Sequence, residues 1–175
     1  MRNPADGEAL VSELGPDASG SIEPLTLDVT DDATISAAAA ALPERLDAVV
    51  NNAGIAIDGP VESLTRQRIT EQFDVNVAGA AAVTLSVGGF ASYAYLFQDD
   101  ASRLDAGGRI VFVSSVSGRI ATPWTGAYNA SKFAVEGMAD SLRLELRPWK
   151  IPVVLVEPAN TKTDMWDGAL DMFDA

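Results

Sequence analysis

Apolar and polar positions alternate along the chain in blocks that predict short strands separated by helices. Short runs rich in apolar residues predict buried strands, and longer segments with apolar positions three and four residues apart predict helices. The predicted strands are 24–29, 47–50, 109–113 and 152–158, and the predicted helices are 31–46, 63–85 and 128–147. This alternation predicts a parallel sheet covered on both faces by helices, which is a doubly wound, Rossmann-like α/β fold.

The longest uncharged run, 75–98, has the length of a membrane-spanning helix. Asn76, Thr84 and the pair Gly88–Gly89 dilute it, so we interpret the run as a buried helix and its connection. The first fifteen residues lack the charged-then-apolar pattern of a signal peptide. We therefore expect a cytoplasmic protein with no membrane partner.

Composition narrows the classes of function. The chain has 175 residues with 47% hydrophobic residues, which predicts a single domain over 1–175 with a real core. Its net charge of −13 argues against a nucleic-acid partner. It contains no cysteine and no histidine, which excludes Ser-His-Asp and Cys-His catalysis and zinc sites built on these residues, so no metal site is predicted. Acid–base chemistry must come from Tyr, Lys, Asp or Glu.

Polar or small residues lie at or directly after the carboxyl ends of all four predicted strands. They are Asp28, the segment 51–54, the pair Ser114–Ser115 and the segment 158–160. Ligands of doubly wound sheets lie at the carboxyl ends of the strands, so this convergence predicts a binding site there.

Tyr128 and Lys132 lie four residues apart in a predicted helix and therefore share one face. A lysine ammonium favours the phenolate, so we expect it to lower the pKa of Tyr128 toward neutrality. Such a phenol can give a proton to a carbonyl oxygen, which Ser115 could also bind. Side chains supply no hydride, so a nicotinamide cofactor is implied. A surface contact between the same two side chains, with no catalytic role, is the simpler alternative.

Five motifs in order resemble the short-chain dehydrogenase/reductase family, from about Arg2 to Thr163. They are "NNAG" (51–54), "FDVNVAG" (73–79), "VFVSSVSG" (111–118), "YNASK" (128–132) and "VEPANTKT" (156–163). Ser115 precedes Tyr128 by thirteen residues, as the serine of that family precedes its tyrosine. The stretch 141–158 resembles the branch that acts on hydroxysteroids, retinoids and similar alcohols.

The resemblance implies roles for individual residues. Tyr128 would be the general acid/base, Lys132 would lower its pKa and bind the nicotinamide ribose, and Ser115 would orient the substrate oxygen. Asn76 would complete a proton relay through water. The remaining cofactor-binding residues would be Arg2, Asp28, Val29, Asn52, Ala53, Gly54, Pro158, Ala159, Thr161 and Thr163, and Arg2 slightly favours NADP over NAD.

Each of these residues also has a purely structural interpretation. Asn76 could bond a backbone carbonyl at a helix kink, and Ser115 could cap a strand end. Asn52 and Gly54 could serve a turn alone. The threonines at 161 and 163 could cap a following helix.

The sequence departs from the family pattern in three places. It contains no glycine-rich phosphate loop, and the first two strands are missing, so we expect a truncated chain with an incomplete sheet that binds cofactor poorly alone. Asn76 and Ser115 are 39 residues apart, which indicates an insertion at about 86–108 in the segment that builds the family's oligomer interface. The usual Pro-Gly after the last strand is Pro158-Ala159.

The sequence therefore predicts an NAD(P)-dependent oxidoreductase that acts on an alcohol or ketone and forms a homo-oligomer. A catalytically inactive fragment, or a non-catalytic partner of a full-length relative, stays open. A sugar-nucleotide epimerase or dehydratase is a third alternative, against which "NNAG" and the position of Ser115 argue.

Overall fold

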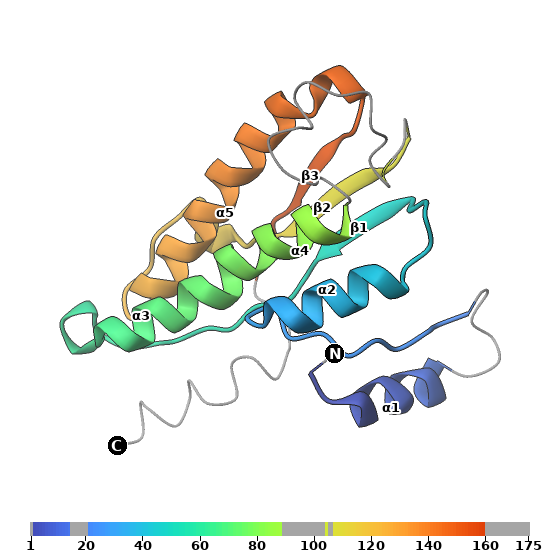
Figure 1. Cartoon of the computed structure of the whole chain (residues 1–175). Coiled ribbons are helices and arrows are strands. Elements are labelled where there is room, and N and C mark those ends of the chain that lie inside the picture. The colour runs from blue at the N-terminus through green and yellow to red at the C-terminus, as the bar shows by residue number, and fades with distance from the viewer. Residues whose placement is uncertain (1, 15–20, 89–103, 105–106, 160–175) are drawn as a thin grey trace.

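The computed structural model describes residues 2–14, 21–88, 104 and 107–159 (Figure 1). Its helices are α1 (Pro4–Leu14), α2 (Asp32–Ala41), α3 (Arg66–Phe73), α4 (Ala80–Val87) and α5 (Gly126–Glu145), and its strands are β1 (Ala48–Asn51), β2 (Arg109–Val113) and β3 (Val153–Val156). A π-helical turn, Asp74–Gly79, joins α3 to α4. Strands and helices alternate from α2 onward, which confirms the predicted α/β class.

The three strands form one parallel sheet in the order β1-β2-β3. Ala48 pairs with Arg109 at the start of β1 and β2, and Ile110 pairs with Val153 at the start of β2 and β3. After β1 and after β2, helices return the chain to the start of the next strand, so the carboxyl ends of the three parallel strands meet at one edge of the sheet (Figure 1).

The core lies between the sheet and helices α2, α4 and α5. Ile110, Phe112 and Ala139 have exposed fractions of 0%, 1% and 0%, and Ile35 of α2 and Val83 of α4 belong to the same cluster. Both crossovers join neighbouring strands in the same direction, and right-handed crossovers of this kind fall on one face of a sheet. The result is a sheet with one thickly packed face.

The opposite face is more open among the described residues. Val50, Val154 and Val156 are 58%, 39% and 44% exposed. Helices were predicted on both faces of the sheet. In the described part of the chain, α2, α4 and α5 cover one face only. β1 and β2 bury alternate residues, and this alternation is typical of a sheet with one packed face.

Three of the four predicted strands are confirmed, and the fourth, 24–29, is wrong. Leu25, Leu27 and Val29 are only partly buried, and the segment belongs to no strand of the described sheet. It ends instead in a turn, where the Asp28 carboxylate accepts hydrogen bonds from the backbone and hydroxyl of Thr30. A short apolar run predicts that its side chains are buried, but it does not predict that the segment pairs in a sheet. Pairing also requires a neighbouring strand, which the local sequence does not reveal.

The helix at 4–14 is absent from the sequence prediction, although its start carries a signal. The side chain of Asn3 accepts a hydrogen bond from the backbone N–H of Ala5, and Pro4 occupies the first helical position. An asparagine cap followed by proline is a common helix start. The three predicted helices are found, although α2 ends at Ala41, before Pro43, instead of at 46.

The predicted insertion at 86–108 lies largely outside the described residues. Of its described positions, Leu104 is 1% exposed and packs into the core. No helix in the described ranges is long and apolar enough to cross a membrane.

We expect Gly79→Ala to lower the free energy of unfolding by about 2 kcal/mol through overpacking. A Cβ on Gly79 would lie 2.7 Å from the Val29 carbonyl oxygen and 2.8 Å from its Cβ, so the segment before α2 would have to move. Urea denaturation measures the change. Gly137→Ala is the matched control, because nothing lies within 4 Å of its added Cβ and alanine favours a helix. A Gly79 variant as stable as the control would contradict this packing.

Candidate active site

The carboxyl end of β2 and the first turns of α5 bring together the residues that the sequence singles out. Ser115 follows β2, and Tyr128 and Lys132 lie on the buried side of α5. Tyr128, Lys132, Ser115 and Asn76 have exposed fractions of 4%, 6%, 8% and 3%. Four polar side chains are thus buried together at one edge of the sheet, which makes this region a candidate active site.

A hydrogen bond joins the side chains of Ser115 and Tyr128. Taken by itself, this hydrogen bond acts to lower the pKa of the tyrosine. Ser115 is held in place by the backbone: its hydroxyl oxygen accepts a hydrogen bond of 3.1 Å from the N–H of Ser117. The chain turns immediately after β2, at Val116–Gly118. The turn therefore orients the serine hydroxyl toward the phenol.

Lys132 is the most strongly perturbed basic group of the site. Its ammonium donates a hydrogen bond of 2.8 Å to the carbonyl oxygen of Val113, the last residue of β2. The same nitrogen lies 5.6 Å from the centroid of the Tyr128 ring, within the range of a cation–π contact. Burial lowers the pKa of Lys132 from 10.5 to about 8, against the opposing attraction of Glu136.

The expected lowering of the Tyr128 pKa is wrong for this state of the chain. Burial raises that pKa, the hydrogen bond with Ser115 acts in the opposite direction, and the charge of Asp58 raises it further. Desolvation outweighs the other influences because the phenolate, unlike the phenol, loses much of its hydration in a buried site. Lys132 lies near enough to act on the phenol, but it is not among the causes that set this pKa.

Asn76 lies in the π-helical turn and clamps the loop after β1. Its side-chain oxygen accepts from the N–H of Ile55 at 2.9 Å, and its amide donates to the Ile55 carbonyl and to Ser131, each at 3.0 Å. Gln72, one turn earlier, makes a parallel clamp on Ile55 and Ile57. Asn76 therefore bonds a backbone carbonyl, as its purely structural interpretation predicts, and it does so next to the helix that carries Lys132.

Gly54 lies at the centre of the site. A Cβ on this residue would be 3.5 Å from the Asn76 side-chain oxygen and 3.9 Å from the Lys132 nitrogen. The loop after β1 thus passes directly over the lysine. Asn52 and Ala53, before Gly54, are exposed at the same edge of the sheet.

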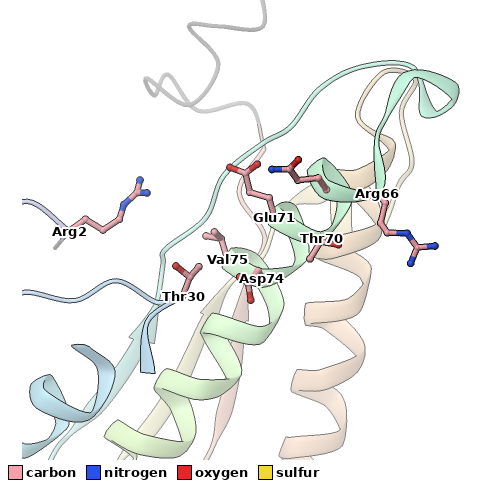
Figure 2. A pocket seen from close by; sticks show the side chains of 8 residues that line it. Arg2, Thr30, Arg66, Thr70, Glu71, Asp74 and Val75 are labelled. Atoms are coloured by element: carbon pink, nitrogen blue, oxygen red, sulfur yellow. The ribbon is translucent and has the colours of Figure 1, made fainter. Parts of the chain in front are cut away.

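Asp28 and Arg2 lie close enough to interact electrostatically, and Val29 follows Asp28 in the chain. Hydrogen bonds from Thr30 lower the pKa of Asp28, and the charge of Arg2 adds to this effect. Figure 2 shows Arg2 on one side of an open pocket of about 500 Å³, with Thr30 and Val75 between it and the acidic Glu71. The pocket thus mixes positive and negative side chains.

The last predicted residues lie after β3. The carbonyl of Pro158 accepts a hydrogen bond of 3.1 Å from Val116, which fixes the end of β3 against the turn that follows Ser115. Ala159 is exposed. Thr161 and Thr163 lie outside the described residues.

Sequence reasoning missed two acidic side chains of this region. The Oδ1 atom of Asp58 is buried without a hydrogen-bond partner among the described residues, and its charge acts on Tyr128. Glu136 is 4% exposed and faces Arg119. A signal for Glu136 was present, since it continues the four-residue spacing of Tyr128 and Lys132. Asp58 gave none, because only the fold places its loop beside α5.

Comparisons with known proteins show which proteins the chain is similar to. A family model described as short chain dehydrogenase matches residues 1–172. YusZ of Bacillus subtilis (strain 168), an uncharacterized oxidoreductase, is 38% identical over 159 residues, which cover 89% of this chain and 52% of the relative. The 17-beta-hydroxysteroid dehydrogenase type 1 of Homo sapiens is 35% identical over 139 residues, covering 79% of this chain and 39% of that protein.

A solved structure shows the same fold. A short chain dehydrogenase/reductase from Burkholderia phymatum in complex with NAD has a TM-score of 0.78 and 27% identity, over 97% of this chain and 58% of its own. The chain spans about half the length of the curated relatives it matches.

Proposed function

The chain belongs to the short-chain dehydrogenase family, and from this premise we propose that it transfers a hydride between a nicotinamide cofactor and an alcohol or carbonyl substrate. One observation carries the proposal: Ser115, Tyr128 and Lys132 are buried together at the carboxyl edge of the sheet, with the ammonium 5.6 Å from the phenol ring. The site contains a proton donor, a hydrogen-bond donor for the substrate oxygen and a cation.

In carbonyl reduction, Tyr128 donates its phenolic proton to the oxygen that becomes the alcohol, and in oxidation it accepts that proton. Ser115 holds the same oxygen through its hydroxyl and fixes the direction of transfer. Lys132 opposes the negative charge that forms on the phenol, which matters because burial raises the pKa of Tyr128. Asn76 holds the loop after β1 beside Lys132. From the family pattern, we also propose that Asn76 takes part in a proton relay through water.

The residues present fit the nicotinamide half of a dinucleotide. Gly54 leaves open the space that a Cβ would fill beside Lys132, so a ligand can approach that ammonium. The cofactor, when bound, supplies or accepts the hydride. Gly54, Tyr128, Lys132, Pro158 and Ala159 would hold the nicotinamide end, and Asn52, Ala53, Asp28 and Val29 would hold the adenosine end. Thr161 and Thr163 stay predictions on the same basis.

The choice between NADP and NAD rests on Arg2 in this proposal. Arg2 is exposed beside Asp28, where a guanidinium can bind a 2′-phosphate. Glu71 and Asp74 line the same pocket and oppose a second negative charge. We propose a modest preference for NADP.

The experiment that tests the function follows nicotinamide absorbance with a panel of ketones and secondary alcohols. Because the chain contains no glycine-rich phosphate loop, the dinucleotide is supplied at high concentration. We expect turnover with a member of the panel, and a lower NADP-to-NAD preference after Arg2→Ala. Absence of hydride transfer with every pair, while the dinucleotide binds, would instead support a non-catalytic partner of a longer relative.

A homo-oligomer that uses α4 and α5 also belongs to this proposal. A groove of about 330 Å³ runs between these helices, lined mainly by apolar side chains such as Leu85, Met138 and Leu142. Leu85 is 52% exposed, and Phe133 and Leu144 elsewhere on α5 are 46% and 72% exposed. A second copy of the chain, related to the first by a two-fold axis, would remove these apolar side chains from water.

We expect Leu85→Asp to convert the oligomer to a monomer, because a carboxylate would be buried in the proposed contact. Sedimentation velocity measures the mass of the assembly. Val61→Asp is the matched control, since Val61 is 66% exposed but lies outside this groove. Equal assembly of both variants and the wild type would place the interface elsewhere.

A further inference from the structure

Glu136 is a buried carboxylate on the same face of α5 as Lys132. It follows Lys132 by four residues, and its exposed fraction is 4%. Side chains with this spacing lie one above the other on a helix. The carboxylate thus extends the line formed by the phenol and the ammonium.

The turn after Ser115 closes over this carboxylate. A Cβ on Gly118 would lie 3.0 Å from the Glu136 Cγ atom and 3.1 Å from its Oε1 atom. Oε1 has no hydrogen-bond partner among the described residues. A buried carboxylate with an unsatisfied oxygen is costly, so it needs compensating positive charge.

Arg119 supplies one such charge from the turn. Its Nη2 atom lies 2.8 Å from Glu136 Oε2, an ion pair whose geometry is not that of an aligned hydrogen bond. The same guanidinium donates two hydrogen bonds to Glu157 after β3, at 3.2 and 3.0 Å. Arg119 is therefore shared between two carboxylates and neutralises Glu136 only in part.

We propose that Glu136 is the counter-ion of the Lys132 ammonium, a positioning residue that keeps this lysine charged beside Tyr128. Arg119 limits the strength of this counter-charge and fixes the turn that carries Ser115. Burial alone would push Lys132 toward its neutral form, and Glu136 acts in the opposite direction. The consequence for catalysis rests on the proposed function, whereas the effect of Glu136 on the protonation of the Lys132 amine is independent of it.

The charged and titratable groups around Lys132 come from four parts of the fold. Tyr128 and Glu136 lie on its own helix, Arg119 on the turn after β2, Glu157 after β3, and Asp58 on the loop after β1, where it acts on Tyr128. Arg119 is the basic member of this set besides Lys132, so removing the charge of Glu136 and removing the charge of Arg119 should have opposite effects on Lys132.

The test titrates the Lys132 amine by NMR in the full chain labelled with ¹³C-lysine, without cofactor. The chain has three lysines, and the signal that disappears in Lys132→Arg identifies the one required. We expect a wild-type midpoint of about 8. Glu136→Gln should lower this midpoint by roughly one pH unit, because the attracting charge is removed.

Arg119→Gln should raise the midpoint, because Glu136 then loses its competing cation. Glu136→Asp should restore a midpoint near that of the wild type, since it keeps the charge. Glu145→Gln is the matched control: the same change on an exposed carboxylate of α5, which should leave Lys132 unaffected.

Opposite displacements in the two variants support the proposal, because a general loosening of the site would move the midpoint in one direction only. An unchanged midpoint in Glu136→Gln, or equal displacement in the Glu145 control, would overturn it. If Glu136→Gln does not fold by circular dichroism, Arg119→Gln decides: a midpoint that stays or falls overturns the proposal. A chain that titrates as expected but transfers no hydride would refute only the proposed function.

Discussion

Tyr128→Phe is expected to reduce hydride-transfer turnover by roughly 10²- to 10⁴-fold, because the substitution removes the proton donor and leaves the ring in place. The buried ring, 4% exposed, keeps its packing, so the free energy of unfolding should change little. The dinucleotide affinity should fall much less than the turnover. Steady-state kinetics with a saturating ketone, together with dinucleotide titration, separate the two quantities.

The matched control is Ser141→Ala, which removes an exposed hydroxyl from the same helix. Its turnover should equal that of the wild type. Turnover retained in the Tyr128 variant would take the phenol out of the mechanism and leave the buried cluster as a structural network.

Lys132→Met is expected to abolish turnover and, near pH 7, to raise the free energy of unfolding by about 2 kcal/mol. The pKa of Lys132 falls from 10.5 to about 8 in the folded chain, and this change corresponds to a penalty of about 3 kcal/mol for the charged form. Methionine avoids the penalty but loses the hydrogen bond to the Val113 carbonyl, which costs about 1 kcal/mol.

The pH dependence gives a sign that can be checked. The folded pKa lies below the unfolded one, so the unfolded chain binds more protons between about pH 8 and 10.5. The penalty is complete below about pH 8 and disappears as the pH rises toward 10.5, so the wild type should gain stability over this window relative to Lys132→Met. Tyr128 is common to both chains, and its burial acts on both stabilities in the same direction.

Urea denaturation near pH 7 and near pH 10 measures both stabilities. Lys150→Met is the matched control, because Lys150 is exposed and its replacement removes no buried charge. A gap between wild type and Lys132→Met that does not narrow with pH would show that the lysine is not desolvated as the structure indicates.

Loss of turnover in Tyr128→Phe together with a gain of stability in Lys132→Met would show that the residues used for catalysis lower the stability of the fold. A buried ammonium with a lowered pKa and a buried phenol with a raised one each make folding less favourable in their charged forms. Such groups are retained in proteins where their reactivity is used.

The sequence alone determined the α/β class, three of the strands and the principal helices. The runs rich in apolar residues at 109–113 and 152–158 mark β2 and β3, because such runs are typical of strands in a parallel sheet. The spacing of Tyr128 and Lys132 determined that they share a helical face, since that depends only on the pitch of the helix.

Only the tertiary structure decided the electrostatics and the partners of these residues. The pKa of Tyr128 depends on burial and on Asp58, which is seventy residues away in sequence and reaches the site through the loop after β1. The strand predicted at 24–29 failed because pairing depends on a neighbour that a local pattern cannot name. Local periodicity follows from the geometry of the backbone, whereas desolvation and long-range charge depend on how distant segments pack.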